Sequence, residues 1–348
     1  STLMDRFGNV SDIIEKDGFK VNEKVYSIVE GDNPTTMAKS TGLAIIELSN
    51  IFENTKPDMV LTVADRFETL ATAVAASYMN IPLVHTQGGE ETGSIDESVR
   101  HAITRLANIH FPATIKSKKN LIKMGEEKKY IFLTGCPSID LAHKVTKEKK
   151  SINASKILNK YKGVGNQFKK NEKFIIVVQH PVTTEYSKTK HQITELIAAI
   201  KSLKIKTIWL WPNIDAGNDI ISKKLRIFRE NNNPKYIQFF KNFEPEDFLK
   251  LLISSKCIVG NSSVAIRECS FLGVSAVNIG SRQRGREFGK NVIHTTHNSK
   301  SIQIAIKKQI IKNKLKSEKI FGDGKAGKRI ANILSKINVI STQKKLSY

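Results

Sequence analysis

One stretch in the second half of the chain, residues 260–263, combines residue types that suit anion binding. The residues before it, 256–259, are apolar and β-branched enough to predict a buried strand. The residues after it, up to a glycine stop at Gly273, predict a short helix. A tight turn there exposes backbone N–H groups and the hydroxyls of Ser262 and Ser263, which together attract a phosphate. Capping of the helix by either serine is the alternative interpretation.

Polar side chains also follow the other apolar segments that predict strands. In the first half they are Asp65, Arg66, His85, Gln87 and Glu90, and in the second half they are His180, Asn213, Asp215 and Arg282. The carboxyl ends of parallel strands meet at one edge of a sheet, where open α/β folds bind their ligands. The carboxylates of the first half suit proton transfer. The hydroxyl, amide, imidazole and guanidinium groups of the second half suit anion binding.

Each of these residues also has a purely structural interpretation. Arg66 beside Asp65 is compatible with a surface ion pair, which is worth roughly 0–1 kcal/mol. Residues 96–101 are compatible with an ordinary helix start, since acidic side chains in the first turn interact favourably with the helix dipole. His180, before Pro181, is compatible with a simple strand end. The recurrence of polar groups at so many strand ends favours a site.

The elements that must hold these residues alternate between strand and helix. Strands are predicted at residues 59–63, 82–85, 109–112, 131–134, 174–178, 206–211, 236–239, 256–259 and 275–279, with helices between most of them. This alternation predicts an α/β fold with parallel, doubly wound sheets. Residues 144–171 are rich in Lys, Asn and Ser with weak periodicity, which indicates a connection between domains.

We therefore expect two Rossmann-like domains, residues 1–150 and 151–335, followed by a tail at residues 336–348. A doubly wound domain usually opens with a central strand, and the first convincing one here is 59–63. The expectation is that the first domain lacks its first strand and begins about one βαβ unit late.

Composition and charge narrow the class of partner. The chain has 348 residues, of which 40% are hydrophobic and 26% charged, as is typical of globular proteins. Its net charge is +23, but the lysines are spread out without interleaved aromatics, so no nucleic-acid partner is predicted. A positive field also draws in a small anionic substrate. No apolar run approaches the roughly 20 residues of a membrane span, so no membrane partner is predicted.

The cysteines predict a reducing compartment. Cys136, Cys257 and Cys269 sit apart in the sequence and have no metal-ligand spacing. Free thiols in a chain of this size favour a cytoplasmic protein without a metal.

Several short motifs follow one another in a set order. They are Asp65-Arg66-Phe67-Glu68, Gly88-Gly89-Glu90 with Gly93, Ile95-Asp96, Arg100-His101-Ala102-Ile103-Thr104, Gly135-Cys136-Pro137-Ser138, Gln179-His180-Pro181-Val182-Thr183-Thr184, Trp211-Pro212-Asn213-Ile214-Asp215-Ala216-Gly217, Gly260-Asn261-Ser262-Ser263, Arg267-Glu268, Arg282-Gln283 with Gly285-Arg286-Glu287, and Phe321-Gly322-Asp323-Gly324. In this order they resemble the hydrolysing UDP-N-acetylglucosamine 2-epimerases of sialic acid biosynthesis. The likeness extends over nearly the whole chain, which makes it far more specific than any single motif.

The resemblance implies a GT-B-type architecture with the active site in the cleft between the domains. Enzymes of this family split UDP from the sugar, invert carbon 2 through a glycal and release N-acetylmannosamine. No cofactor or metal takes part, and a homo-oligomer, a dimer or tetramer, is expected. The catalytic residues implied are Asp65, Asp96, Gln87, Glu90 and His85, of which the two aspartates are the acid/base candidates. The residues implied to bind the UDP-sugar are Arg66, His180, Asn213, Asp215, Ser262, Ser263, Glu268 (on the ribose) and Arg282.

Two departures from the family pattern leave alternatives open. In the sialic-acid branch the position of Gln87 is a catalytic glutamate, whereas glutamine has no titratable proton. The loop is more similar to relatives acting on UDP- or GDP-linked 2,4-diacetamido-2,4,6-trideoxy sugars for legionaminic acid. The family's N-terminal Gly-Thr-Arg phosphate loop has no counterpart here. A diacetamido-sugar 2-epimerase, a non-hydrolysing 2-epimerase and a catalytically inactive nucleotide-sugar binder are therefore the alternatives.

Overall fold

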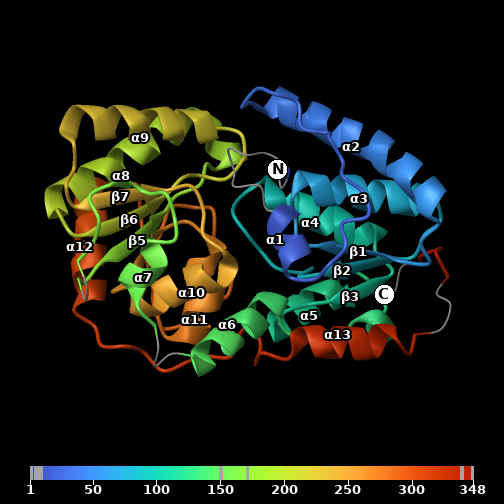
Figure 1. Ribbon diagram of the computed structural model, residues 1–348. Helices are drawn as coiled ribbons and strands as arrows, with labels where there is room; N and C mark the ends of the chain where they lie inside the picture. Colours follow the sequence, from blue (N-terminus) through green and yellow to red (C-terminus); the bar gives the residue numbers. More distant parts are fainter. Residues whose placement is uncertain (1–2, 4–10, 149–151, 170–171, 338–340, 346–348) are drawn as a thin grey trace. The chain divides into compact units, whose positions relative to one another are not determined.

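The computed structural model describes residue 3 and residues 11–148, 152–169, 172–337 and 341–345, which cluster into two compact units (Figure 1). Unit 1 takes in Ser1–Lys20, Leu141–Gln283 and Glu287–Ile320, and unit 2 takes in Val21–Asp140, Arg284–Arg286 and Phe321–Tyr348. The linear domain boundaries expected from the sequence stay a prediction. Of the predicted tail at 336–348, residues 338–340 and 346–348 lie outside the described residues.

Unit 1 is built on a seven-stranded sheet with the order β10-β9-β8-β5-β6-β7-β4. Its strands are β4 (Val164–Gly165), β5 (Ile175–Val178), β6 (Thr207–Leu210), β7 (Ile237–Phe240), β8 (Ile258–Gly260), β9 (Ala276–Ile279) and β10 (Val292–Thr295). Every neighbouring pair is parallel except β4 with β7. The chain builds outward from β5 in one direction and then returns to β8 on its other side. This confirms the predicted doubly wound topology and places its switch point between β5 and β8.

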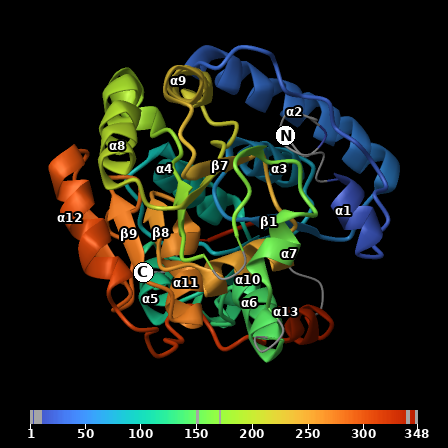
Figure 2. The ribbon, with the colours of Figure 1, turned by 60° about the vertical axis from the view of Figure 1, so that its left-hand side comes forward.

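Helices cover both faces of this sheet. They are α7 (Ala154–Leu158), α8 (Thr189–Leu203), α9 (Asn218–Asn232), α10 (Pro245–Ser254), α11 (Arg267–Leu272) and α12 (Ser299–Ile310), with the 3₁₀ helices η4 (Thr183–Lys188) and η5 (Ser263–Ala265), while α1 (Ser11–Lys16) and α6 (Pro137–Lys147) precede them. Helices α8 and α12 lie side by side on one face (Figure 2). Leu196 and Ile306 from these helices pack with Trp209 and Val259 of the sheet.

Unit 2 has a three-stranded parallel sheet in the order β1-β2-β3. Its elements are β1 (Val60–Val63), β2 (Leu83–Thr86), β3 (Ile109–Phe111), α2 (Pro34–Thr55), α3 (Phe67–Tyr78), α4 (Ile95–Leu106), α5 (Ile115–Lys123), η2 (Lys128–Tyr130) and α13 (Ala326–Leu334). Leu83 packs towards α3 and α4, and α2 lies outside α3 (Figure 1). Val84 points to the opposite face, where Ile330 of α13 joins the core.

The longest helix, α2, shows how local sequence sets an element. The Asn33 side chain accepts the N–H of Thr36 in a capping box, and Pro34 occupies the first turn. The helix ends at Thr55, and the C-cap residue Lys56 is left-handed with φ of 45°. None of the helices formed by the described residues combines the length and apolar character that a membrane span needs.

The structure differs from the sequence-based expectation at several elements. The strand predicted at residues 131–134 is only a single bridge, between Ile131 and His110. The helix predicted directly after residues 260–263 begins at Arg267, because the 3₁₀ helix η5 occupies the intervening turn. β4, β10 and α13 were not predicted, since each of these elements is short.

The C-terminal segment is tied to unit 2 by buried and capping carboxylates. Asp140 accepts the backbone N–H groups of Ala326 at 2.9 Å and Gly327 at 2.7 Å, at the start of α13. Lys344 lies 2.6 Å from the buried Glu126. These contacts explain why residues far apart in sequence form one unit.

Gly260, at the end of β8, provides a test of the strand spacing. It has φ of +136°, and a Cβ there would lie 1.9 Å from the carbonyl oxygen of Val178. We expect Gly260→Ala to lower the free energy of unfolding by about 2 kcal/mol or more, because β8 must move away from β5. Urea unfolding measures this change.

The matched control is Gly42→Ala on the exposed side of α2, where an added Cβ meets no atom within 4 Å. Alanine should raise stability there by about 0.5–1 kcal/mol. A Gly260→Ala protein as stable as the unsubstituted chain would contradict the close approach of the two strands.

Candidate functional site

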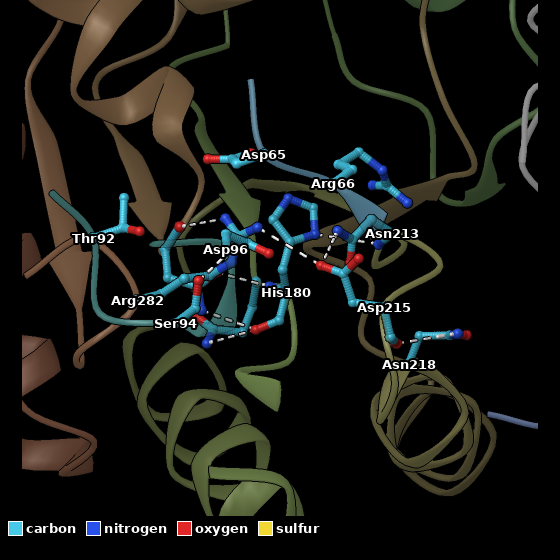
Figure 3. A network of polar contacts seen from close by, with 12 residues as sticks. Asp65, Arg66, Thr92, Ser94, Asp96, His180, Asn213, Asp215, Asn218 and Arg282 are labelled. Atoms are coloured by element: carbon cyan, nitrogen blue, oxygen red, sulfur yellow. Dashed lines mark hydrogen bonds and ion pairs between the residues drawn. The ribbon is translucent and has the colours of Figure 1, made fainter. Parts of the chain in front are cut away.

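Polar side chains gather at the strand ends on either side of the switch point in unit 1 (Figure 3). We call them the switch-point set: His180, Asn213, Asp215, Asn261, Arg282 and Gln283. They follow β5, β6, β8 and β9, whose last residues are in register, since Val178 pairs with both Leu210 and Gly260. The polar residues predicted from strand ends in the second half are therefore brought together.

Asn261 joins the two strands that flank the switch point. Its side-chain amide donates to the carbonyl of His180 at 2.8 Å, and its side-chain oxygen accepts the N–H of His180 at 2.8 Å. The backbone carbonyl of Asn261 accepts a hydrogen bond from Nε2 of Gln283, also at 2.8 Å. These bonds fix the turn after β8 against the turn after β5 and the loop after β9.

The His180 ring is oriented by the loop after β6. The backbone N–H of Asn213 donates to its Nδ1 at 3.2 Å. Because Nδ1 accepts this bond, the neutral ring carries its proton on Nε2. Nε2–H is then a donor suited to an anionic oxygen.

The Asp215 carboxylate contacts two neighbouring side chains of the switch-point set. Its Oδ2 accepts the side-chain amide of Asn213 at 2.5 Å and lies 3.7 Å from the Arg282 guanidinium (Figure 3). The Asp215 and Arg282 side chains are largely buried. The carboxylate therefore compensates the guanidinium charge and restricts its direction, which suits binding.

Ser262 and Ser263 do not cap the helix that follows them. The residue before α11 is Ile266, and Ser262 makes no side-chain capping hydrogen bond at η5. The capping interpretation is wrong, and the anion-binding role of the two serines stays a prediction. Glu268, in the first turn of α11, is buried, and its Oε2 has no hydrogen-bond partner among the described residues. A ligand hydroxyl would satisfy such an acceptor.

A second polar set lies in unit 2 at the ends of β1 and β2 and around α4. We call it the carboxylate set: Asp65, His85, Glu90, Asp96, Arg100 and Arg286. Asp65 pairs with the guanidinium of Arg100, whose side chain is 0% exposed. The other guanidinium nitrogen of Arg100 donates to the carbonyl of Glu90 at 2.7 Å. The loops after β1 and β2 are thus bridged by one buried cation.

His85 is buried inside β2. Its Nε2 lies 2.8 Å from the carbonyl of Ala64, and its Nδ1 lies 3.2 Å from the Thr104 hydroxyl. Burial lowers the pKa of His85 from 6.5 to about 3, so the ring is neutral and donates to Ala64. The direct catalytic role predicted for His85 stays a prediction. The ring supports Ala64, which precedes Asp65 and is left-handed with φ of 63°.

Glu90 and Gln87 are both buried in the loop after β2. Glu90 lies 3.3 Å from Arg286, with side-chain exposures of 3% and 4%. Gln87 is left-handed with φ of 62°, and its backbone N–H donates to the carbonyl of Phe111 at 3.0 Å. The loop is therefore anchored to β3 and to Arg286, and catalytic roles for these two residues stay predictions.

Asp96 and Arg66 are more accessible. Asp96 lies in the first turn of α4 and accepts the Ser94 hydroxyl at 2.9 Å. Arg66 pairs with Glu68 at 3.1 Å, and its side chain is 36% exposed. Among the described residues, no group of three or more His, Cys, Asp or Glu side chains is arranged to hold a metal ion.

Four residues with clear positions in these sets were not assigned individually from the sequence: Arg100, Arg286, Asn261 and Gln283. One signal could have identified Arg100. It shares the buried face of α4 with Ile103 and Thr104, and a charged residue on an apolar face needs a buried partner. Asn261 and Gln283 carry no comparable sequence signal.

His85 gives a pH-dependent test. Between pH 6.5 and about 3 the unfolded chain binds a proton that the native His85 does not, so stability falls as the pH falls. From pH 7 to pH 5 we expect this residue to cost about 2 kcal/mol, at about 1.4 kcal/mol per unit. Urea unfolding at the two pH values gives the difference.

His85→Gln keeps an amide donor for Ala64 and removes the titrating ring, so its loss of stability between pH 7 and pH 5 should be smaller by that amount. His101→Gln, on the part-exposed side of α4, should follow the unsubstituted protein. Equal pH dependence in His85→Gln and the unsubstituted chain would remove His85 as the cause.

Comparison with known proteins adds family information. A family model described as UDP-N-acetylglucosamine 2-epimerase matches residues 4–335. A Legionella pneumophila protein named UDP-N,N'-diacetylbacillosamine 2-epimerase (hydrolyzing) is 33% identical over 95% of this chain and 85% of its own length. A Campylobacter jejuni GDP/UDP-N,N'-diacetylbacillosamine 2-epimerase (hydrolyzing) is 34% identical over 85% and 75%. A UDP-N-acetylglucosamine 2-epimerase of Neisseria meningitidis is 29% identical over 92% and 81%.

Solved structures give the same fold. The Methanocaldococcus jannaschii UDP-GlcNAc 2-epimerase, in complex with UDP-GlcNAc and UDP, superposes with a TM-score of 0.78 at 20% identity, covering 96% of this chain and 89% of that one. The Neisseria meningitidis enzyme bound to UDP-GlcNAc superposes with a TM-score of 0.75 at 19% identity, covering 94% and 89%. At these identities the likeness concerns the fold, which is the GT-B type predicted from the sequence.

Proposed function

The chain belongs to the UDP-N-acetylglucosamine 2-epimerase family, and from this premise we propose that it hydrolyses a UDP-linked 2-acetamido sugar with inversion of carbon 2. The products are UDP and the free manno-configured sugar. The observation that carries the proposal is the grouping of anion-binding donors in the switch-point set and of carboxylates at the strand ends of unit 2. The hydrolysing reaction is preferred because two relatives, at 33% and 34% identity, bear that word in their names.

The switch-point set would bind and activate the UDP leaving group. The proton on carbon 2 of the sugar is not acidic, so the bond between carbon 1 and the phosphate oxygen must break early. His180 and Arg282 supply donors for the charge that develops on the diphosphate. Ser262 and Ser263 add hydroxyl donors, and Glu268 would accept from the ribose. Arg66, Asn213 and Asp215 complete the proposed substrate-binding group.

The carboxylate set would carry out proton transfer. UDP departs with the bonding electron pair, and a carboxylate removes the carbon-2 proton to give a glycal with a double bond between carbons 1 and 2. Water then adds its oxygen to carbon 1, and a proton reaches carbon 2 on the opposite face. Asp65 and Asp96 are the two groups we assign to these proton transfers. Gln87 has no titratable proton, so we assign it to positioning. We assign Glu90 to the same role because its buried carboxylate faces Arg286.

The sugar itself has two candidates, N-acetylglucosamine and N,N'-diacetylbacillosamine. The second is favoured by Gln87 and by the names of the Legionella and Campylobacter relatives. Another relative, from Escherichia coli, is named polysialic acid biosynthesis protein P7. By analogy, we propose that the free sugar is a precursor of a nonulosonic acid. The homo-oligomeric state expected from the resemblance stays a prediction.

Incubation with each UDP-sugar tests the proposal. We expect release of free UDP together with a free 2-epimerised sugar, identified by proton NMR, and faster turnover of the diacetamido substrate. Return of a UDP-linked epimer would support the non-hydrolysing reaction instead. Binding of UDP by calorimetry without turnover of either sugar would support an inactive binder.

Asp65→Asn tests the assignment of the general acid/base. The amide keeps the size of the side chain and cannot exchange a proton, so kcat should fall by roughly 100-fold or more while UDP binding is retained. Asp58→Asn, exposed before the amino end of the same strand, is the matched control and should leave kcat unchanged. Near-normal turnover in Asp65→Asn would exclude Asp65 from proton transfer.

A further inference from the structure

Arg100, in unit 2, is a buried residue to which the proposed function assigns no role. Its side chain is 0% exposed, although a fully buried guanidinium is costly unless it is paired. One terminal nitrogen pairs with the carboxylate of Asp65, and the other donates to the carbonyl of Glu90 at 2.7 Å. Both nitrogens also lie 3.4 Å from the Thr92 hydroxyl. Every acceptor belongs to a loop that follows a strand end.

Helix α4 presents Arg100 in line with two other polar residues. Asp96, Arg100 and Thr104 stand at successive i, i+4 positions, which places them along one stripe of the helix. Thr104 contacts His85 at 3.2 Å, and His85 contacts the carbonyl of Ala64 at 2.8 Å. The residue before Asp65 and the carboxylate of Asp65 are therefore both held from the same helix that carries Asp96.

The contacts continue beyond Asp65. Arg100 holds the backbone of Glu90, and the side chain of Glu90 lies 3.3 Å from Arg286. Two buried arginines thus fix the loop after β2, one through its backbone and one through its carboxylate. A shift of Arg100 would remove one contact from the loop after β1 and one from the loop after β2 together.

We propose that Arg100 is the positioning residue of the proton-transfer site, holding the Asp65 carboxylate and the loop at residues 90–92 in one fixed arrangement relative to Asp96. This inference rests on the proposed function, since it concerns the geometry of the same proton transfer. Arginine is suited to the task because its planar fork reaches two acceptors in fixed directions. A lysine carries its three donors on one nitrogen at the end of a flexible chain, so it does not reach these separated acceptors in the same fixed directions.

Arg100→Lys tests this role because it keeps the positive charge that compensates Asp65. We expect kcat to fall by roughly 100-fold, since a displacement of about 1 Å at a reacting group has that effect. The dissociation constant for UDP and the KM should change by less than threefold, because the proposed UDP-binding groups other than Arg66 lie in unit 1. A purely structural role would not produce this split between kcat and KM.

Arg105→Lys is the matched control on the same helix. Arg105 contacts Glu126 and the carbonyl of Met124 at 3.1 Å, away from the carboxylate set, and its substitution should leave kcat within twofold. Thr92→Val is a second, milder variant that removes one acceptor of Arg100 while keeping the side-chain shape. We expect roughly a fivefold loss of kcat from it, and urea unfolding identifies any variant that fails to fold.

Chemical rescue separates positioning from general stabilisation. Millimolar guanidinium should raise the kcat of the Arg100→Ala protein at least tenfold. It should leave the kcat of the Arg105→Ala protein unchanged. A normal kcat in Arg100→Lys, or a folded Arg100→Ala without rescue, would overturn the inference. If the unsubstituted chain releases UDP from neither sugar, the proposed function fails and this inference fails with it. If the unsubstituted chain does release UDP, the kcat values of the Arg100 variants alone test the inference.

Discussion

The close approach of β5 and β8 is the constraint on which the arrangement of unit 1 depends. Only a residue without a Cβ allows the backbone of β8 to come so near Val178, and Gly260 supplies it. The next residue, Asn261, then reaches His180 with two hydrogen bonds of 2.8 Å. Through that turn the loops after β6 and β9 acquire fixed contacts, so His180 and Arg282 follow from one backbone geometry.

In unit 2 the residues that follow the strand ends are held in place by hydrogen bonds to strained backbone. Ala64 and Gln87 are left-handed non-glycine residues directly after β1 and β2, a conformation that costs of order 1–3 kcal/mol each. His85 donates to the carbonyl of Ala64, and the carbonyl of Phe111 accepts from Gln87. Buried hydrogen-bond partners therefore hold the turn directly before Asp65 and the turn after β2 in place.

The sequence predicted the strands and their polar ends well because both depend on local composition. Most strand bounds in unit 1 lie within two residues of the expectation, and His180, Asn213, Asp215 and Arg282 do lie together. Pairing could not be predicted, because it depends on contacts between distant segments. The pairs of Arg66 with Glu68 and of Asp65 with Arg100 were not among the predictions. The burial of His85 could not be predicted for the same reason, since it is a tertiary property. The weak elements β4 and β10 depend on neighbours that only the folded sheet supplies.

Charge compensation inside each unit connects stability with catalysis. Arg282 faces Asp215, Arg100 faces Asp65, and Arg286 faces Glu90, each within its own unit. Removing one member of a buried pair typically costs about 3–5 kcal/mol, because the other charge stays buried and uncompensated. The pairs therefore hold their donors and carboxylates in place before a substrate binds, and such preorganised groups need no reorganisation when charge develops. It follows that a deletion at these positions removes stability and activity together, whereas substitutions that keep charge or shape separate the two.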